Sequence, residues 1–265
     1  MSAGSTEGHD QPNGAGRTGE KPSVKEIVRG MGVLLGPSLL LGLLVVFGTR
    51  AVMTGWVFRR RKGLARLLRL LAIVGALFPW AYAFAIRPWH LRWGATDEEV
   101  EKQLPGDELV SDPGIESTRA ITVSAPVEEV WPWLAQVGQD RGGFYSYEWL
   151  ENLAGARMRN ADRIHPEWQH REVGETVFLH PATGPKVASF GPGRAMVLEG
   201  WGAFVVEPID ERSTRVILRS RTPKRLGMLL YYLLTIEIPH FIMERRMLKG
   251  LKERAEQTRD GRKPT

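Results

Sequence analysis

The sequence has no cysteine among its 265 residues. This absence excludes disulfide bonds, zinc sites built on thiolates and a cysteine nucleophile, and it fits any cellular compartment. A signal peptide is not expected, because the first residues are polar and charged with no apolar stretch near the terminus. With so little apolar periodicity, residues 1–28 are expected to form a disordered tail, and residues 259–265 a second one.

The chain is basic, but it lacks a nucleic-acid-binding motif. Its formal net charge is +6 and its pI is about 9.7. The densest basic cluster, Arg59 to Lys62, lies between two apolar runs, which favours a loop beside membrane helices over a nucleic-acid surface. The arginines at positions 215, 219 and 221 belong to no such motif either and are expected on a solvated or lipid-facing strand edge.

Two charge-free runs predict a transmembrane hairpin over residues 29–89. Residues 31–48 and 70–86 are uncharged over roughly 18 and 17 positions, close to the ~20 that cross a bilayer core. The helices are expected to extend over 31–57 and 67–87, the second with aromatic residues at the headgroup level. The alternative is a buried helical hairpin in a soluble protein, which the basic loop between the two runs disfavours.

The distribution of arginine and lysine predicts the orientation of this hairpin. The loop between the spans is much richer in basic residues than the segment after the second span. By the positive-inside rule the loop faces the cytoplasm, so the protein is expected to be a multi-pass cell-membrane protein with its C-terminal domain outside the cytoplasm. The basic residues of the N-terminal tail act against this orientation.

The C-terminal part reads as a mixed α and β domain over 118–258, joined to the hairpin by a polar linker over 90–117. The pattern predicts strands, two short helices, more strands and a long final helix. The expected ranges are strand 118–123, helices 126–137 and 145–153, strands 176–180, 186–190, 195–201, 203–207 and 214–221, and helix 239–257.

Four short motifs carry a resemblance to a known family. They are Ile-Thr-Val-x-Ala-Pro-x-x-x-Val-Trp at 121–131, Gly-Gly-Phe-Tyr-Ser-Tyr at 142–147, Ala-Asp-Arg-Ile at 161–164 and Pro-His-Phe-Ile-Met-Glu-Arg at 239–245. With the order of the elements, residues 104–255 resemble the START/Bet v 1-like superfamily, also called SRPBCC, and in particular its polyketide cyclase/dehydrase and lipid-transport branch.

The resemblance implies an α+β helix-grip fold, in which a curved antiparallel sheet wraps the C-terminal helix around a cavity. Such cavities hold lipids, sterols or polyketides, and the superfamily contains both carriers and enzymes. The expected function is membrane-anchored binding or transport of a hydrophobic small molecule or lipid, without a cofactor. The alternatives are a cyclase or dehydratase acting on a polyketide-like substrate, and an interaction protein whose cavity is filled by its own tryptophans.

Aromatic and basic residues of the domain are the candidate ligand-binding groups. Aromatic rings suit a greasy ligand, although each of them is also an ordinary core residue. Arg245 falls within the apolar stripe of the final helix, where it needs an anionic partner, either a structural carboxylate or a ligand head group. The full set is Trp131, Tyr145, Tyr147, Trp149, Arg163, Trp168, Trp201 and Arg245.

Two further features have alternative interpretations. Asp162 and His165 suit a general acid/base pair or a hydrogen-bonded loop, and the spacing of the histidines matches no metal motif, so no metal is expected. Residues 226–238 form an apolar run too short for a span, which either inserts shallowly into the bilayer surface or packs beneath the final helix. The ligand's identity and the oligomeric state do not follow from the sequence.

Overall fold

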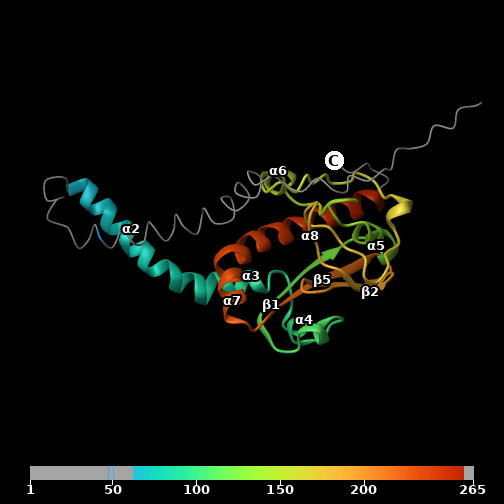
Figure 1. Ribbon diagram of the computed structural model, residues 1–265, viewed down its shortest axis with the longest axis horizontal. Coiled ribbons are helices and arrows are strands. Elements are labelled where there is room, and N and C mark those ends of the chain that lie inside the picture. Colours follow the sequence, from blue (N-terminus) through green and yellow to red (C-terminus); the bar gives the residue numbers. More distant parts are fainter. Residues whose placement is uncertain (1–46, 48–49, 51–61, 260–265) are drawn as a thin grey trace, which may run out of the picture.

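The computed structural model describes residues 47, 50 and 62–259. The predicted tail 1–28, nearly all of the first predicted span and residues 260–265 lie outside the described residues. The described part confirms an α+β architecture, with a five-stranded antiparallel sheet crossed by a long C-terminal helix (Figure 1).

The helices and strands follow one another in an order close to the expected one. The helices are α2 (Lys62–Ala81), α3 (Arg87–Leu91), α4 (Asp97–Glu101), α5 (Val127–Ala135), α6 (Glu148–Leu153), α7 (Leu226–Tyr231) and α8 (Glu237–Arg259). The strands are β1 (Pro113–Val123), β2 (Val187–Gly191), β3 (Ala195–Leu198), β4 (Gly202–Asp210) and β5 (Ser213–Pro223). Single turns of π-helix, η1 (Tyr82–Ile86) and η4 (Tyr232–Ile236), and of 3-10 helix, η2 (Asp107–Val110) and η3 (Pro166–Trp168), complete the chain.

The sheet has the strand order β1-β5-β4-β3-β2, and its side chains alternate between two buried faces. Phe204 and Leu218 point to one face, whereas their neighbours Val205 and Ile217 point to the other. This period of two is what strand geometry requires when both faces are covered. The sheet is therefore the middle of three layers.

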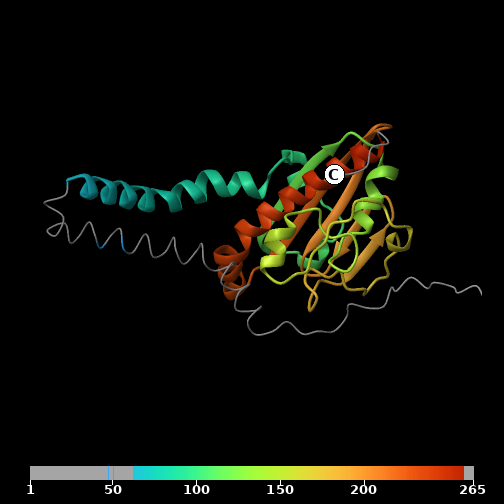
Figure 2. The same cartoon turned by 90° about the horizontal axis from the view of Figure 1, so that it is seen from above.

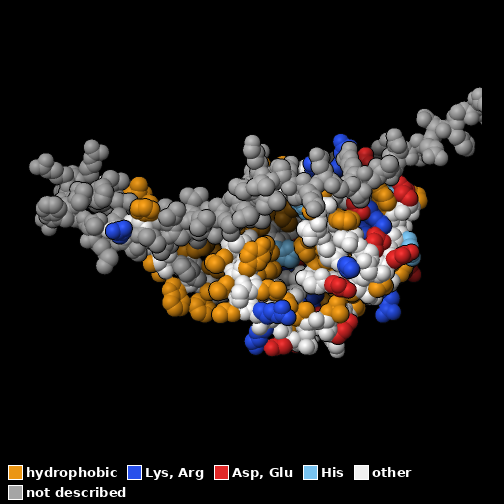
Figure 3. Space-filling model, viewed as in Figure 1, with side chains coloured by type: hydrophobic (Ala, Val, Ile, Leu, Met, Phe, Trp, Pro, Cys, Tyr) orange, Lys and Arg blue, Asp and Glu red, His pale blue; other side chains and the backbone are white. Residues whose placement is uncertain are grey.

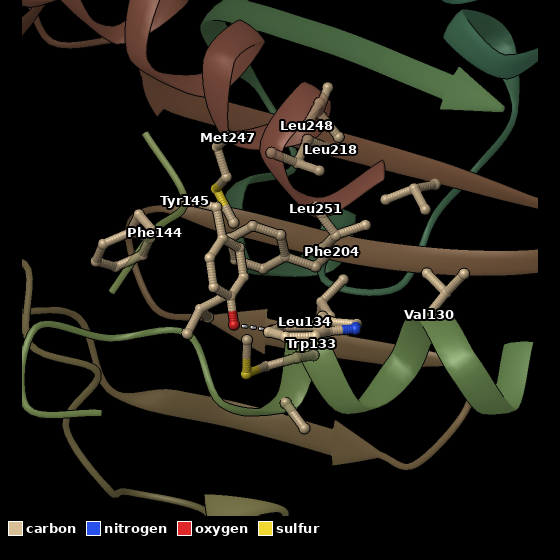
Figure 4. Close-up of a cluster of buried hydrophobic side chains, with 14 of the residues drawn as sticks. Val130, Trp133, Leu134, Phe144, Tyr145, Phe204, Leu218, Met247, Leu248 and Leu251 are labelled. Atoms are coloured by element: carbon tan, nitrogen blue, oxygen red, sulfur yellow. Dashed lines mark hydrogen bonds between the residues drawn. The ribbon is translucent and has the colours of Figure 1, made fainter. Parts of the chain in front are cut away.

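The first face packs against α5 and α8 and holds the larger core (Figure 4). Leu248, Leu251 and Ala255 of α8 are buried there, as the predicted apolar stripe requires, whereas Ile242 of that stripe is exposed. Gly250 lies where α8 approaches the loop after α5: a Cβ at this position would stand 2.2 Å from the carbonyl oxygen of Tyr145. Only glycine permits this approach.

The second face is covered by the segment that was expected to be a linker, and that prediction is wrong. Leu104 is buried against this face. Glu99 of α4 binds Arg215 at 2.6 Å, and Asp107 of η2 binds Arg219 at 2.8 Å. Arg219 is thus buried and fully paired rather than solvated, and strand β1 begins at Pro113, five residues earlier than expected.

Two of the remaining expectations also differ from the structure. Residues 176–180 form isolated bridges, Thr176 with Lys186 and His180 with Thr183, instead of a strand. Two prolines in 181–185 remove backbone donors from this stretch, which limits ladder formation. The second short helix starts at Glu148 rather than at 145, because Tyr145 has a left-handed backbone with a φ of 55°.

The helix that begins with α2 and the helix that ends with α8 share one local feature. Each runs continuously through a π-turn that precedes a proline: η1 before Pro88 and η4 before Pro239. A proline in a helix lacks the N–H and clashes with the preceding turn, and a π-turn accommodates both defects. As a result α2, η1 and α3 form one rod that projects away from the domain (Figure 2).

A buried carboxylate joins this rod to the helix that contains α8. Glu237 is fully buried and accepts hydrogen bonds from Arg87 at 2.9 Å and from Tyr82 at 2.5 Å. The imidazole of His90 lies 3.5 Å from the same carboxylate. Because breaking such a buried pair is costly, the rod and the domain are held together at this point.

Candidate functional site

A pocket of about 250 Å³ lies between α8, α6 and the loops that follow α5 and α6. Its wall is mostly apolar, and its polar groups come from a serine, a histidine and two glutamates. The lining residues are Phe144, Ser146, Glu151, Met158, Leu179, Trp201, Ile236, Pro239, His240, Met243, Glu244 and Met247. An apolar pocket with a few convergent polar groups is the usual form of a small-molecule site.

The α8 side of the pocket carries a cluster of polar side chains that are joined by ion pairs. Glu244 forms ion pairs with the buried Arg119 of β1 and with His240, whose Nε2 is 2.8 Å from it. The other ring nitrogen of His240 is 3.0 Å from the hydroxyl of Tyr232. Trp201 packs edge-on against the same imidazole, with the ring centroids 5.0 Å apart. The members of the cluster therefore contact one another within the protein.

The α6 side carries one glutamate without such partners. Oε2 of Glu151 is buried and has no hydrogen-bond partner. Burial raises the pKa of this carboxyl to about 7, and the negative charge of Glu148 adds to the effect. A carboxyl in an apolar wall favours its neutral form, so Glu151 keeps its proton up to a pH of about 7 and presents an O–H donor below it.

The loop between the two sides is held firmly. Gly138 and Gly143 exchange two backbone hydrogen bonds, of 3.0 and 2.8 Å. The side chain of Asn160 accepts a hydrogen bond from the N–H of Tyr145 and donates one to the carbonyl of Ser146. Since the hydroxyl of Ser146 also donates to the Met243 carbonyl of α8, the Gly-Gly turn is a braced wall of the pocket.

Among the residues that the sequence suggested for ligand binding, Trp201 lines the pocket. Tyr145 lies behind the wall: it is fully buried, and its hydroxyl donates to the carbonyl of Trp133 (Figure 4). Trp131 is also buried and packs against Phe190 at 5.4 Å between ring centroids. Tyr147 and Trp149 pack on each other at the surface, and Trp149 is 64% exposed.

The basic candidates lie away from the lining. Arg245 is half-buried, and its guanidinium lies 5.2 Å from the ring centre of Trp93. The adjacent Glu244, in contrast, is buried and paired with Arg119. Arg163 is exposed, and Trp168 stacks on His165 at 3.9 Å.

The residues suggested as an acid/base pair are not brought together at the pocket. Asp162 is exposed, and His165 is 3.1 Å from the exposed Glu167. The groups with chemistry at the pocket are instead Glu151 and His240. Within residues 62–259, no cluster of three or more His, Asp or Glu side chains is placed to hold a metal ion.

A broad apolar surface lies next to the pocket. The helix that includes α7 and η4 exposes apolar side chains, and Figure 3 shows hydrophobic groups gathered where α7 lies. These residues therefore do not pack beneath the final helix. Among the described residues, two helical stretches, Arg69–Leu91 and Leu226–Arg259, are long and apolar enough to cross a membrane, a criterion that buried core helices also meet.

Comparison with known proteins adds little to the family resemblance seen in the sequence. No family model and no curated protein matches the chain. A solved structure, the solution NMR structure of the Polyketide_cyc-like protein Cgl2372 from Corynebacterium glutamicum, is similar at 14% identity, covering 55% of this chain and 94% of that chain with a TM-score of 0.30. The likeness is compatible with the resemblance seen in the sequence but is too low to establish a shared fold or activity.

Proposed function

We propose that this protein binds a hydrophobic small molecule, or one apolar chain of a lipid, in the pocket between α6 and α8 while it is anchored in a membrane. The observation that carries the proposal is the pocket itself, an apolar space with one unsatisfied carboxyl in its wall. An apolar pocket with a few polar groups in its wall is the usual form of a site for such a ligand.

The size of the pocket limits the ligand. Its volume of about 250 Å³ lies just below the ~300–1,000 Å³ typical of small-molecule sites. This suits a compact ring or a single alkyl or isoprenoid chain, and it is too small for a whole phospholipid. Each methylene transferred from water into such a space contributes about 0.8 kcal/mol to binding.

The membrane anchor is supported by the exposed surface of the rod formed by α2, η1 and α3. Leu70, Ile73, Val74 and Leu77 all expose about half of their side-chain area or more. Exposed apolar area of this extent on one long helix is typical of a segment in contact with lipid. The excess of arginine in 50–69 supports a cytoplasmic loop and thus a domain outside the cytoplasm.

The lack of cysteine makes this orientation easy to test. Val173 is 71% exposed on the domain, so a single Val173→Cys substitution provides one accessible thiol. A membrane-impermeant maleimide should label this variant in intact cells. Labelling that requires permeabilised cells would place the domain in the cytoplasm instead.

The route into the pocket is proposed along α7 and η4. Ile236 of η4 and Pro239 of α8 line the pocket, whereas Leu230 and Leu234 on the preceding turns are exposed. Apolar residues therefore extend along one helix from the surface to the pocket. If η4 lies at the bilayer surface, a lipid-soluble ligand enters without crossing water.

Native mass spectrometry of the full-length protein tests ligand binding. Protein purified in detergent from the producing cells is expected to carry a hydrophobic adduct at one copy per chain. Met243→Trp, which fills the pocket, should lose the adduct, whereas Val173→Trp on the exposed loop should keep it. An adduct that persists in Met243→Trp would contradict binding in this pocket.

A cyclase or dehydratase activity is the second candidate, favoured by the carboxyl of Glu151. A pKa of about 7 is suited to general acid catalysis near neutral pH, and His240 lines the same pocket. Turnover separates the two functions, because a carrier returns its ligand unchanged. Recovery of a modified ligand after incubation with wild-type protein, but not with Glu151→Gln, would favour the enzyme.

A further inference from the structure

The charges around the pocket restrict the polar group of its ligand, if the proposed function holds. No lysine or arginine lines the pocket. The nearest arginine in the polar cluster, Arg119, is buried and bonded to Glu244 and to the carbonyl oxygen of His90. Nδ1 of His240 is 3.0 Å from the hydroxyl of Tyr232, and Nε2 is within ion-pair distance of Glu244, at 2.8 Å.

An anionic ligand would therefore meet two carboxyl groups and no free cation. Placing a carboxylate or phosphate in an apolar space without a counter-charge is strongly unfavourable. A phosphate head group or an ionised fatty acid is excluded on this ground. A neutral ligand does not incur this cost.

Glu151 contributes a carboxyl to the wall of the pocket, and its buried Oε2 has no hydrogen-bond partner. The residue belongs to a short helix that is braced by two hydrogen bonds between the side chain of Asn152 and the backbone of Met158. The hydroxyl of Ser146 already donates its hydrogen to Met243. A ligand oxygen beside Glu151 would give this carboxyl a hydrogen-bond partner.

We propose that the pocket selects neutral, apolar molecules that carry a single hydrogen-bond acceptor, such as a long-chain ketone, and that Glu151 donates the hydrogen bond to this acceptor. The other charged groups near this position are Glu148 on the same helix, and His240 and Glu244 of α8 across the pocket. Because an ionised Glu151 cannot donate, binding of a ketone depends on its proton.

Photo-crosslinking with two matched ten-carbon probes tests the inference on the full-length protein in nanodiscs. The probes are 2-decanone and decanoate, each carrying a diazirine near the end of the chain, and labelled peptides are identified by mass spectrometry. At pH 6 the ketone should label peptides that contain Met158, Met243 or Met247 at least tenfold more efficiently than decanoate. Between pH 6 and pH 8.5 its labelling should fall about tenfold or more.

Two substitutions of similar size distinguish donation from packing. Glu151→Gln keeps an N–H donor at every pH, so labelling by the ketone should persist and lose its pH dependence. Glu151→Leu removes the donor and should reduce labelling about tenfold at pH 6. Circular dichroism of both variants checks that they remain folded.

The outcomes separate this inference from the proposed function. Equal labelling by decanoate would overturn the selectivity and leave the pocket as a binding site. The same labelling in wild type and Glu151→Leu would overturn the role of Glu151. Absence of labelling at the lining residues by every probe would contradict the proposed function itself.

Discussion

Each side of the pocket carries a glutamate, and the two glutamates differ in whether they have partners. Glu244 on the α8 side is buried and paired with Arg119 and His240. Glu151 on the α6 side has a buried oxygen with no partner. A buried carboxylate that is paired contributes to the integrity of the fold, whereas an unpaired one is a cost that a ligand can remove.

This contrast assigns the two sides different roles. The α8 side is a rigid frame whose charges are balanced within the protein. The α6 side offers the group that is available to another molecule. Substitutions at matched positions on the two sides should therefore separate stability from binding.

The largest effect on stability is expected when the ion pair between Glu244 and Arg119 is removed. Glu244→Gln leaves the guanidinium of Arg119 buried without its counter-charge, which should reduce the free energy of unfolding by about 3–5 kcal/mol. The matched control is Glu253→Gln on the same helix, where an exposed pair with Arg246 is removed and about 1 kcal/mol or less should be lost. Chemical unfolding of both variants measures the difference, and equal losses would contradict the distinction.

A smaller effect on stability is expected at Gly250, where α8 contacts the loop that contains Tyr145. The added methyl of Gly250→Ala would stand 2.2 Å from the backbone oxygen of Tyr145, so the helix and loop must separate, at a cost of about 1–3 kcal/mol. Gly227→Ala on α7 has nothing within 4 Å of the new methyl and should stabilise the helix by about 0.5–1 kcal/mol. If both substitutions shift the melting temperature in the same direction, the contact between Gly250 and the backbone of Tyr145 is not tight.

The pH dependence of stability tests the α6 side without a ligand. In the folded protein the pKa of Glu151 is raised from 4.5 to about 7, so between these pH values the folded chain keeps a proton that the unfolded chain has released. The free energy of unfolding should therefore fall as the pH rises through this window, by at most about 1.4 kcal/mol per pH unit. Glu151→Gln removes this component of the slope, and an unchanged slope would indicate that Glu151 is ordinarily solvated.

The smallest effects are expected at the residues outside the lining. Asp162→Asn and His165→Gln should change the affinity for 2-decanone by less than about twofold, because Asp162 is exposed and His165 stacks on Trp168. Trp201→Leu, which alters the wall, should weaken binding several-fold. Competition against a fluorescent apolar probe measures the affinities of the three variants. A large loss of affinity in Asp162→Asn would indicate that the ligand binds at the loop 161–168 instead.

The sheet and the final helix could be predicted because their signals are local. Alternation of apolar side chains locates β4 and β5, and a helical stripe locates Leu248, Leu251 and Ala255. The structure of residues 90–112 could not be predicted, since it depends on partners more than 100 positions away in the sequence. Nothing in a polar stretch indicates that Glu99 and Asp107 will meet Arg215 and Arg219.

The site was less predictable than the fold, for a similar reason. Trp201 was identified because aromatic residues are enriched in pocket walls. Glu151 was missed, since it follows Glu-Trp-Leu in what reads as an exposed acidic helix, and its apolar surroundings come from α8 and distant loops. The His240 and Glu244 pair was detectable as an i,i+4 spacing, but the adjacent arginines suggested a solvated face.

Methionine methyl NMR of the full-length protein tests the central claim most directly. Met158, Met243 and Met247 line the pocket, whereas Met196 of β3 is buried in the core between the sheet and α8, outside the lining, and Met228 is exposed on α7. Addition of 2-decanone to detergent-solubilised protein is predicted to shift the methyl signals of the three lining residues and to leave that of Met196 unchanged. A shift confined to Met228 would show that the ketone only enters the detergent around α7, and would contradict ligand binding in the pocket.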